Sequence, residues 1–202
     1  MSSDSASKPR YALSFTSGGL LEREATVLAS VYAERRNWAS VRDFAVGENL
    51  LQTRTRSSGV RRVRETIKRL SAMSDAEVES LCEITTTERG HLMWTAACRC
   101  YDLVGEFAEE VLRERFLTLA GSVSYDDFDS FFRAKAMWHD ELGEVTDHSY
   151  KKLRQVLFRM MVEAGLLTGN GKIEPALLST RVVDFLNEHT PSDIRFFPTR
   201  LV

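Results

Sequence analysis

Apolar side chains recur every three or four positions along most of the chain, and no proline occurs between Pro9 and Pro175. This spacing matches the 3.6 residues per turn of an α-helix, and a stretch without proline can keep its helical hydrogen bonds. The pattern predicts a mainly α protein with helices at about 20–36, 38–51 and 60–72, two helices within 88–119 that break near Gly105, and helices at about 125–142 and 147–164.

Polar residues at the expected helix starts refine this pattern. Ser74 to Glu77 has the spacing of a capping box, and Ser124 with the acids after it marks a further helix start. Asp147 is the expected cap of the last long helix. Tyr11 to Phe15 is expected to be extended, and Gly169-Asn170-Gly171 between two short apolar runs predicts a small β-hairpin.

The helix expected at 60–72 is basic on one side. Its apolar stripe consists of Val60, Val63, Ile67 and Leu70. The opposite side and the preceding link carry the residues that we expect to contact phosphate, namely Arg54, Arg56, Arg61, Arg62, Arg64, Lys68 and Arg69. Together with the helix before it, this helix predicts a helix-turn-helix. An acidic protein surface and a merely solvated face are the alternatives for the same charge pattern.

The helix expected at 147–164 repeats the arrangement. Leu153, Val156 and Leu157 mark its apolar face. The candidate DNA-binding residues of this region are Lys151, Lys152, Arg154, Gln155, Arg159 and, on the hairpin, Lys172. A helix followed by a small hairpin is typical of a winged helix, a fold that also occurs in protein–protein modules. The chain would then divide into a disordered tail (1–10), an N-terminal helical bundle (11–122) and a C-terminal winged-helix-like module (123–202).

The formal net charge of −2 hides an uneven distribution over the 202 residues. Residues 1–73 contain 13 basic and 7 acidic residues, residues 74–146 contain 6 and 16, and residues 147–202 contain 8 and 6. Arginine outnumbers lysine 21 to 6, and its planar guanidinium can bind phosphate through two donors. The acidic middle would either turn the basic faces toward a nucleic acid or bind a basic protein partner.

Several function classes receive no support from the sequence. The longest stretch without Asp, Glu, Lys or Arg runs only from Tyr11 to Leu21, too short for a membrane span, and no apolar signal segment precedes it, so a cytoplasmic protein is expected. The four histidines are scattered, and Cys98 and Cys100 lack chelating spacing. With no phosphate-binding glycine loop and no catalytic motif, we expect no enzyme activity, cofactor, metal or small-molecule substrate.

Longer strings of the sequence resemble a known family, the BrxA proteins of the BREX bacteriophage-exclusion systems. The resemblance covers about residues 10–198, and the strings that carry it are Leu13–Ala25, Asn49–Thr55, Glu88–Trp94, Asp126–Phe131, Lys152–Phe158 and Pro191–Pro198. It implies a helical protein, similar in part to the antitermination protein NusB, that belongs to a phage-defence system. It further implies binding of double-stranded DNA in place of catalysis.

Together these observations predict a non-enzymatic double-stranded DNA-binding protein that contacts the phosphate backbone with little sequence specificity. Arg and Lys predominate on both faces, and few Asn or Gln residues, whose amides pair with base edges, lie there. One alternative is an adaptor that joins other BREX proteins through the acidic middle segment. A second is an RNA-binding protein, which the similarity to NusB suggests.

Overall fold

The computed structural model describes residues 10–201, so residues 1–9 of the predicted tail lie outside the described part. The helices are α1 (Glu22–Arg35), α2 (Trp38–Gly47), α3 (Arg56–Leu70), α4 (Asp75–Ser80), α5 (Thr86–Cys100), α6 (Asp102–Phe107), α7 (Glu114–Leu117), α8 (Tyr125–Ala136), α9 (Asp140–Gly143), α10 (Asp147–Glu163) and α11 (Thr180–Asn187). The prediction of a mainly α fold is confirmed. Throughout residues 10–201, every helix is too short or too polar to span a bilayer.

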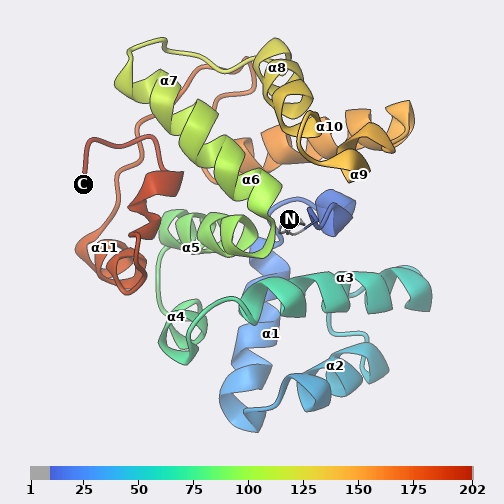
Figure 1. Cartoon of the computed structure of the whole chain (residues 1–202). Coiled ribbons are helices and arrows are strands. Elements are labelled where there is room, and N and C mark those ends of the chain that lie inside the picture. The colour runs from blue at the N-terminus through green and yellow to red at the C-terminus, as the bar shows by residue number, and fades with distance from the viewer. Residues whose placement is uncertain (1–9, 202) are drawn as a thin grey trace, which may run out of the picture.

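Helix α5 lies at the centre of the molecule (Figure 1), with α1 to α4 on one side and α6 to α10 on the other. It is buried on nearly all sides, and the indole of Trp94 donates a hydrogen bond of 2.9 Å to the carbonyl of Phe196. Phe196 belongs to η3 (Asp193–Phe196), a 3₁₀ turn near the C-terminus. The end of the chain therefore packs against the N-terminal bundle.

One cluster of buried side chains runs through the whole described chain, from Tyr11 to Phe197. It includes Leu28 of α1, Phe107 of α6 and Leu157 of α10. The boundary that we place near residues 120–125 stays a prediction, and the core is continuous across it.

Two of the predicted helix starts are confirmed in detail. Ser74 and Glu77 form a capping box at α4, and Ser124 and Asp127 form a second one at α8. The cap of α10 differs, because Thr146 accepts the hydrogen bond from the backbone N–H of Ser149. Asp147 is the first helical residue instead, where its charge still favours the positive end of the helix dipole.

Helix α3 begins earlier than the hydrophobic pattern indicates. Thr55 caps it by accepting from the N–H of Ser58, so the helix starts at Arg56. Val60, predicted to belong to the core stripe, is 43% exposed, whereas Val63 and Leu70 are fully buried. The stripe is therefore shorter than the sequence suggests, and the first turns of α3 extend beyond the core.

Helix α5 ends at Cys100, and the break before α6 lies at Tyr101, not near Gly105 as predicted. Gly105 lies inside α6 and close to α5, where an added Cβ would come within 3.0 Å of the Cys98 carbonyl oxygen. Helix α6 then continues into η2 (Ala108–Arg113), a π-helical turn, and α7. Gly105 thus allows α5 and α6 to pack closely. In the sequence, a glycine at such a contact looks the same as a glycine that breaks a helix.

Three further predictions fail or remain unconfirmed. Helix α8 ends at Ala136, and α9 is a separate short helix. Ser14 and Phe15, predicted to be extended, belong to η1 (Ser14–Thr16), a 3₁₀ turn. In place of a hairpin ladder, the described residues contain two isolated bridges, Ser122 with Lys172 and Leu167 with Ile173.

Candidate nucleic-acid interface

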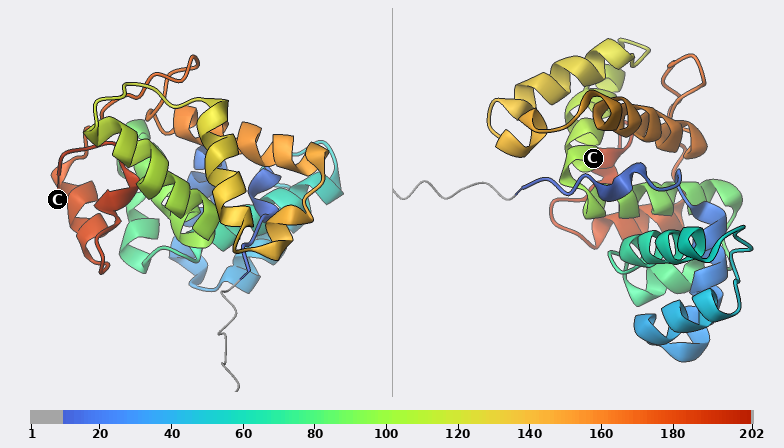
Figure 2. Two further views of the ribbon diagram at one scale, coloured as in Figure 1. Left: turned by 45° about the horizontal axis from the view of Figure 1, so that its top comes forward. Right: turned by 90° about the vertical axis from the view of Figure 1, so that its right-hand side faces the viewer.

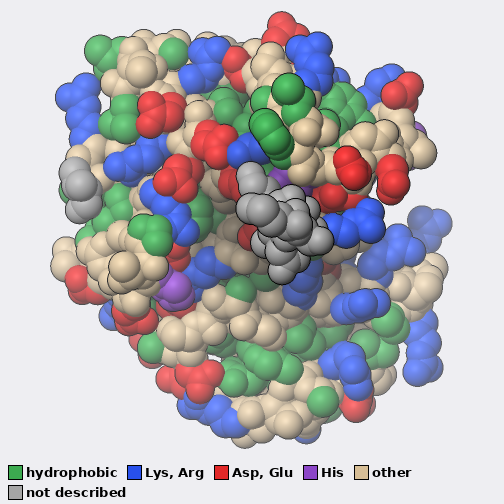
Figure 3. All heavy atoms as spheres, viewed as in Figure 1, with side chains coloured by type: hydrophobic (Ala, Val, Ile, Leu, Met, Phe, Trp, Pro, Cys, Tyr) green, Lys and Arg blue, Asp and Glu red, His purple; other side chains and the backbone are tan. Residues whose placement is uncertain are grey.

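The first turns of α3 carry a group of exposed arginines. Thr55 fixes the helix start, and its hydroxyl donates to Ser58 Oγ at 2.8 Å. The arginines that extend outward from this part of the chain, each without a carboxylate partner among the described residues, are Arg54, Arg56, Arg61 and Arg64. Lys and Arg side chains gather at the right-hand edge of the molecule, over α3 (Figure 3). We call these four residues the α3 arginine group.

Two other predicted residues of α3 are exposed but engaged. Arg62 donates to Glu24 of α1 at 3.0 Å. Lys68 places its ammonium group 4.0 Å from the centre of the Tyr101 ring. Both remain on the solvent side of the helix, and a surface ion pair of this kind is weak enough to exchange for a phosphate.

Arg69 is the exception and corrects the sequence prediction. Its side chain is completely buried, forms an ion pair with Glu65 at 3.0 Å, and donates to the carbonyl oxygens of Gly19 and Leu20 at 2.8 and 3.1 Å. Glu65 in turn accepts from the Tyr101 hydroxyl at 2.7 Å. A side chain held in this way cannot reach DNA, so Arg69 supports the fold and is excluded from the interface.

The exposed side of α10 is basic but partly neutralised. Lys151 and Gln155 are exposed and Lys152 is half-buried. Arg154 is bound to Asp129 of α8 by contacts of 2.6 and 2.9 Å. Partial burial alone would raise the pKa of Asp129, but hydrogen bonding by Tyr150 and Arg154 lowers it. Arg154 therefore stays paired over the ordinary pH range.

The last two predicted residues also have internal partners. Arg159 donates to the Gly18 carbonyl and lies 3.6 Å from Glu163. Lys172 lies on the loop after α10 and forms an exposed ion pair with Glu174 at 2.9 Å. Its place on a winged-helix hairpin remains a prediction, because the loop forms no ladder.

The segment Gly18 to Leu21 connects the two basic helices. The backbone N–H of Leu20 donates to Glu163 of α10 at 2.5 Å, while Arg69 of α3 binds the carbonyl of the same residue. Viewed from the right-hand side (Figure 2), α3 and α10 lie one above the other with residues 10–21 between them. A cleft of about 460 Å³ at this junction is lined by Arg62 and Arg159. The fold thus brings both predicted faces to one side of the molecule.

Arg23 also lines this cleft, although no sequence pattern marks it as a candidate. Its neighbours Glu22 and Glu24 give the start of α1 a mixed charge, so no run of bases marks it. Glu22 has a raised pKa because it is partly buried, with Glu163 nearby adding to the shift. The cleft therefore combines three arginines with three carboxylates.

The acidic middle of the chain forms a separate surface. Glu106 and Glu110 bind Lys135 at 2.5 and 2.7 Å. Burial and a hydrogen bond to Glu106 raise the pKa of Tyr11. Beside this cluster, Met137 and Trp138 are 78% and 73% exposed. A large exposed aromatic side chain next to acidic groups is typical of a protein-binding surface.

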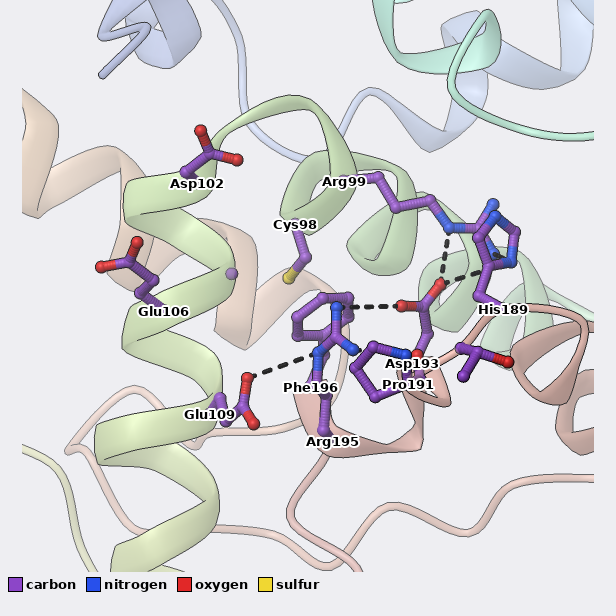
Figure 4. A pocket seen from close by; sticks show the side chains of 12 residues that line it. Cys98, Arg99, Asp102, Glu106, Glu109, His189, Pro191, Asp193, Arg195 and Phe196 are labelled. Carbon is purple, nitrogen blue, oxygen red and sulfur yellow. Dashed lines mark hydrogen bonds and ion pairs between the residues drawn. The ribbon is translucent and has the colours of Figure 1, made fainter. Parts of the chain in front are cut away.

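A cavity of about 320 Å³ between α5, α6 and η3 is lined by ion-paired side chains (Figure 4). Asp193 lies 2.7 Å from Arg99 and 3.8 Å from His189, and Arg195 lies 3.3 Å from Glu109. Arg99 also binds Glu77. These groups neutralise one another, and their arrangement is that of a structural network.

Within residues 10–201, no three His, Cys, Asp or Glu side chains are grouped to hold a metal ion. Burial raises the pKa of the thiols of Cys82, Cys98 and Cys100, which disfavours the nucleophilic thiolate. Burial lowers the pKa of His91, so this imidazole is neutral at pH 7. Cys98 and His91 are buried and have the environment of packing residues, whereas Cys82 is exposed.

Comparisons with known proteins give a consistent result. The sequence model of the BrxA family matches residues 9–190. The chain is 27% identical over 149 residues to the BREX protein BrxA of Bacillus cereus. This match covers 72% of the chain and 74% of the Bacillus cereus protein. The chain is 22% identical over 148 residues to the BREX protein BrxA of Escherichia coli, covering 73% and 70%.

The fold also has a counterpart among solved structures. The crystal structure of an uncharacterized protein from Magnetospirillum magneticum superimposes with a TM-score of 0.76. The superposition covers 94% of this chain and 98% of the Magnetospirillum magneticum chain, and the two sequences are 21% identical. At that identity the similarity establishes a shared fold over nearly the full length.

Proposed function

The chain belongs to the BrxA family of BREX phage-defence systems, and on that premise we propose that it is a non-enzymatic protein that binds double-stranded DNA through α3 and α10. The observation that carries this proposal is the α3 arginine group, Arg54, Arg56, Arg61 and Arg64, which has no carboxylate partner among the described residues. Like charges repel along an exposed helix, and a polyanion removes that repulsion.

The location of α10 supports the same proposal. Lys151 is exposed and Lys152 half-buried on α10, a helix that the Gly18–Leu21 segment connects to α3. A rigid duplex placed across both helices would gain contacts from each without bending the protein. The acidic cluster around Glu106 of α6 lies on the other side of α5 from α3 (Figure 1) and would repel phosphate, which favours one orientation of the protein on DNA.

Contacts of this kind read phosphate more than base sequence. Arginine and lysine supply most of the available donors, so affinity is expected to depend strongly on salt and little on sequence. If about six phosphates are neutralised, affinity should fall about a thousandfold between about 50 and 200 mM salt.

Fluorescence anisotropy with a labelled duplex, a single strand and an RNA of the same sequence tests the proposal. Duplex DNA should bind at low salt, and the double variant Arg61→Glu, Arg64→Glu should abolish binding while it keeps the helical circular-dichroism signal. Arg181→Glu is the matched control, because Arg181 is an exposed arginine of α11 at the opposite edge of the molecule (Figure 1). Tighter binding of RNA than of duplex DNA would favour an RNA-binding function.

The alternative is an adaptor that joins other BREX proteins, and the exposed Met137 and Trp138 beside the acidic cluster favour it. The adaptor function predicts that Trp138→Ala disrupts a complex with a basic BREX partner while duplex affinity stays unchanged. Absence of duplex binding at low salt, together with loss of that complex in the variant, would make the adaptor the better account.

A further inference from the structure

A second cavity on α10 differs from the clefts described above. It measures about 440 Å³ and opens between the start of α8, the exposed side of α10 and the loop at residues 168–171. The side chains that define it are Tyr125, Gln155, Phe158, Arg159, Val162 and Asn170. Two of them, Gln155 and Arg159, belong to the predicted DNA-binding face.

The lining of this cavity contains no carboxylate. Each of three other cavities in the described part of the chain is lined by at least three carboxylates, including Glu22, Asp102 and Glu106. Carboxylates repel a phosphate backbone, and their absence here lets a nucleic acid strand approach closely. The cavity is therefore the one among these four whose charge suits a polyanion.

Aromatic rings form one side of the cavity. Tyr125 is 46% exposed, and its ring meets that of Phe158 at a centroid distance of 4.7 Å and an angle of 87°. The guanidinium of Arg154 lies 4.4 Å from the centre of the Tyr125 ring, and Asp129 fixes that guanidinium. Aromatic side chains held in place beside arginine are the usual means by which proteins bind unpaired bases.

Amide groups face the same space. Asn170 accepts a hydrogen bond from the Thr168 hydroxyl through its side-chain oxygen, which leaves its NH₂ group able to donate. Gln155 is exposed, and its amide has no partner among the described residues. Side-chain amides match the donor and acceptor groups on base edges.

The loop that carries Asn170 is held against α8. The N–H of Val123 donates to the Gly171 carbonyl at 2.8 Å, and Gly171 has a φ of +83°. A Cβ at this glycine would come within 2.5 Å of the Val123 carbonyl oxygen, so the close approach requires glycine. The cavity is thus formed before any ligand binds.

From this geometry we propose that the cavity binds one unpaired nucleobase of the DNA that α3 and α10 hold. The base lies against Tyr125 and Phe158, and its edge forms hydrogen bonds with Gln155 and Asn170. This inference rests on the proposed DNA binding and specifies its substrate. Extruding a base from an intact duplex costs unstacking and unpairing free energy, so DNA with an unpaired base should bind more tightly than a perfect duplex.

The test uses two labelled duplexes that differ only in one unpaired 2-aminopurine, titrated with the full chain at low salt. The bulged duplex should bind about tenfold more tightly, as expected for one stacked base. Emission of the 2-aminopurine should fall on binding, because the base stacks on an aromatic ring.

Two variants separate the cavity from the duplex site. Tyr125→Ala should abolish the preference and the fluorescence change while its affinity for the perfect duplex stays that of the wild type. Asn170→Ala, at an exposed loop position, should weaken the preference without affecting the fold.

Equal affinity for both duplexes, or a preference that survives Tyr125→Ala, would overturn the inference and leave DNA binding intact. Failure to bind either duplex would instead overturn the proposed function and this inference with it. The affinity for the perfect duplex, measured in the same titration, tells the two results apart.

Discussion

Arg69 of α3 has a structural role because it belongs to a buried cluster of charged and polar groups. Arg69 and Glu65 form a buried ion pair, Tyr101 donates to Glu65, and Arg69 Nη1 donates to the carbonyls of Gly19 and Leu20. Removing one partner from such a pair leaves the other charge buried without compensation, which costs more free energy than the pair contributes.

Arg69→Ala should therefore lower the free energy of unfolding by about 3–5 kcal/mol. Denaturant unfolding, monitored by circular dichroism, measures this loss of unfolding free energy. Arg61→Ala, an exposed residue of the same helix, is the control and should change stability by less than about 0.5 kcal/mol. If the two variants are equally stable, Arg69 does not have the structural role assigned to it.

The sequence could not have separated Arg69 from its neighbours. Arg69 lies on the polar side of the helical wheel, with Arg61 and Arg62. Its burial depends on the Gly19–Leu20 segment, which precedes the N-terminus of α1 and contacts α3. Periodicity within one helix says nothing about a segment 50 residues away in sequence. The exposed residues Arg61 and Arg64, in contrast, lie where the wheel places them.

Two helix starts were predictable from a short motif, whereas the caps at Thr55 and Thr146 were not. The capping boxes at Ser74 and Ser124 need only residues three apart, and both are present. The break at Tyr101 and the separate helix α9 depend on how α5, α6 and α8 pack against one another, which local sequence does not encode. A winged-helix-like module likewise depends on how its helix and loop pack together, and it stays a prediction.

One carboxylate connects two helix starts. Glu88 accepts from the Ser179 hydroxyl of the α11 cap at 2.6 Å, and from both the backbone N–H and the hydroxyl of Thr85 at the α5 cap. The hydrogen bond from Ser179, followed by those from Thr85, lowers the pKa of Glu88 from 4.5 to about 2. Because the folded-state pKa is lowered, this stabilisation is present above pH 4.5 and is lost as the pH falls toward 2.

Glu88→Gln should therefore be less stable than the wild type at pH 6, and the difference should shrink as the pH falls through 4.5 toward 2. Denaturant unfolding at a series of pH values measures the difference. Glu48→Gln is the control, since Glu48 is an exposed residue beyond α2. A constant gap between wild type and Glu88→Gln at all pH values would show that the ionised carboxylate is not what joins the two caps.

The spacing between α3 and α10 depends on a glycine. A Cβ at Gly19 would overlap the Glu163 carboxylate that accepts from Leu20 N–H, so Gly19→Ala must displace Glu163 and break that bond. Because the carboxylate is the far end of a flexible side chain, we expect only the loss of one hydrogen bond, about 1 kcal/mol in unfolding free energy. Gly47→Ala is the matched control: an added Cβ meets nothing within 4 Å there, and the change should stabilise α2 by up to about 1 kcal/mol. Thermal unfolding of both variants distinguishes them, and equal effects would contradict this role for Gly19.

Over the whole molecule, basic and acidic side chains gather on different surfaces, although the net charge is only −2. The basic N-terminal third and α10 meet at the cleft near Arg62 and Arg159, while the acidic middle surrounds Lys135 and Trp138. The sequence predicts the sign of each segment, because counting charges requires no fold. It does not predict that the two basic helices lie on one side, since that depends on the Gly18–Leu21 junction and its contacts with Arg69 and Glu163.

If one duplex contacts α3 and α10 together, the salt dependence of duplex affinity should respond to changes on either helix. Each phosphate contact that is removed should make the slope of log K against log salt shallower by about one. The pair Arg61→Ala, Arg64→Ala and the pair Lys151→Ala, Lys152→Ala should each reduce the slope by about two, and all four changes together by about four. A slope that stays unchanged in either pair, or no duplex binding at about 50 mM salt, would contradict the account.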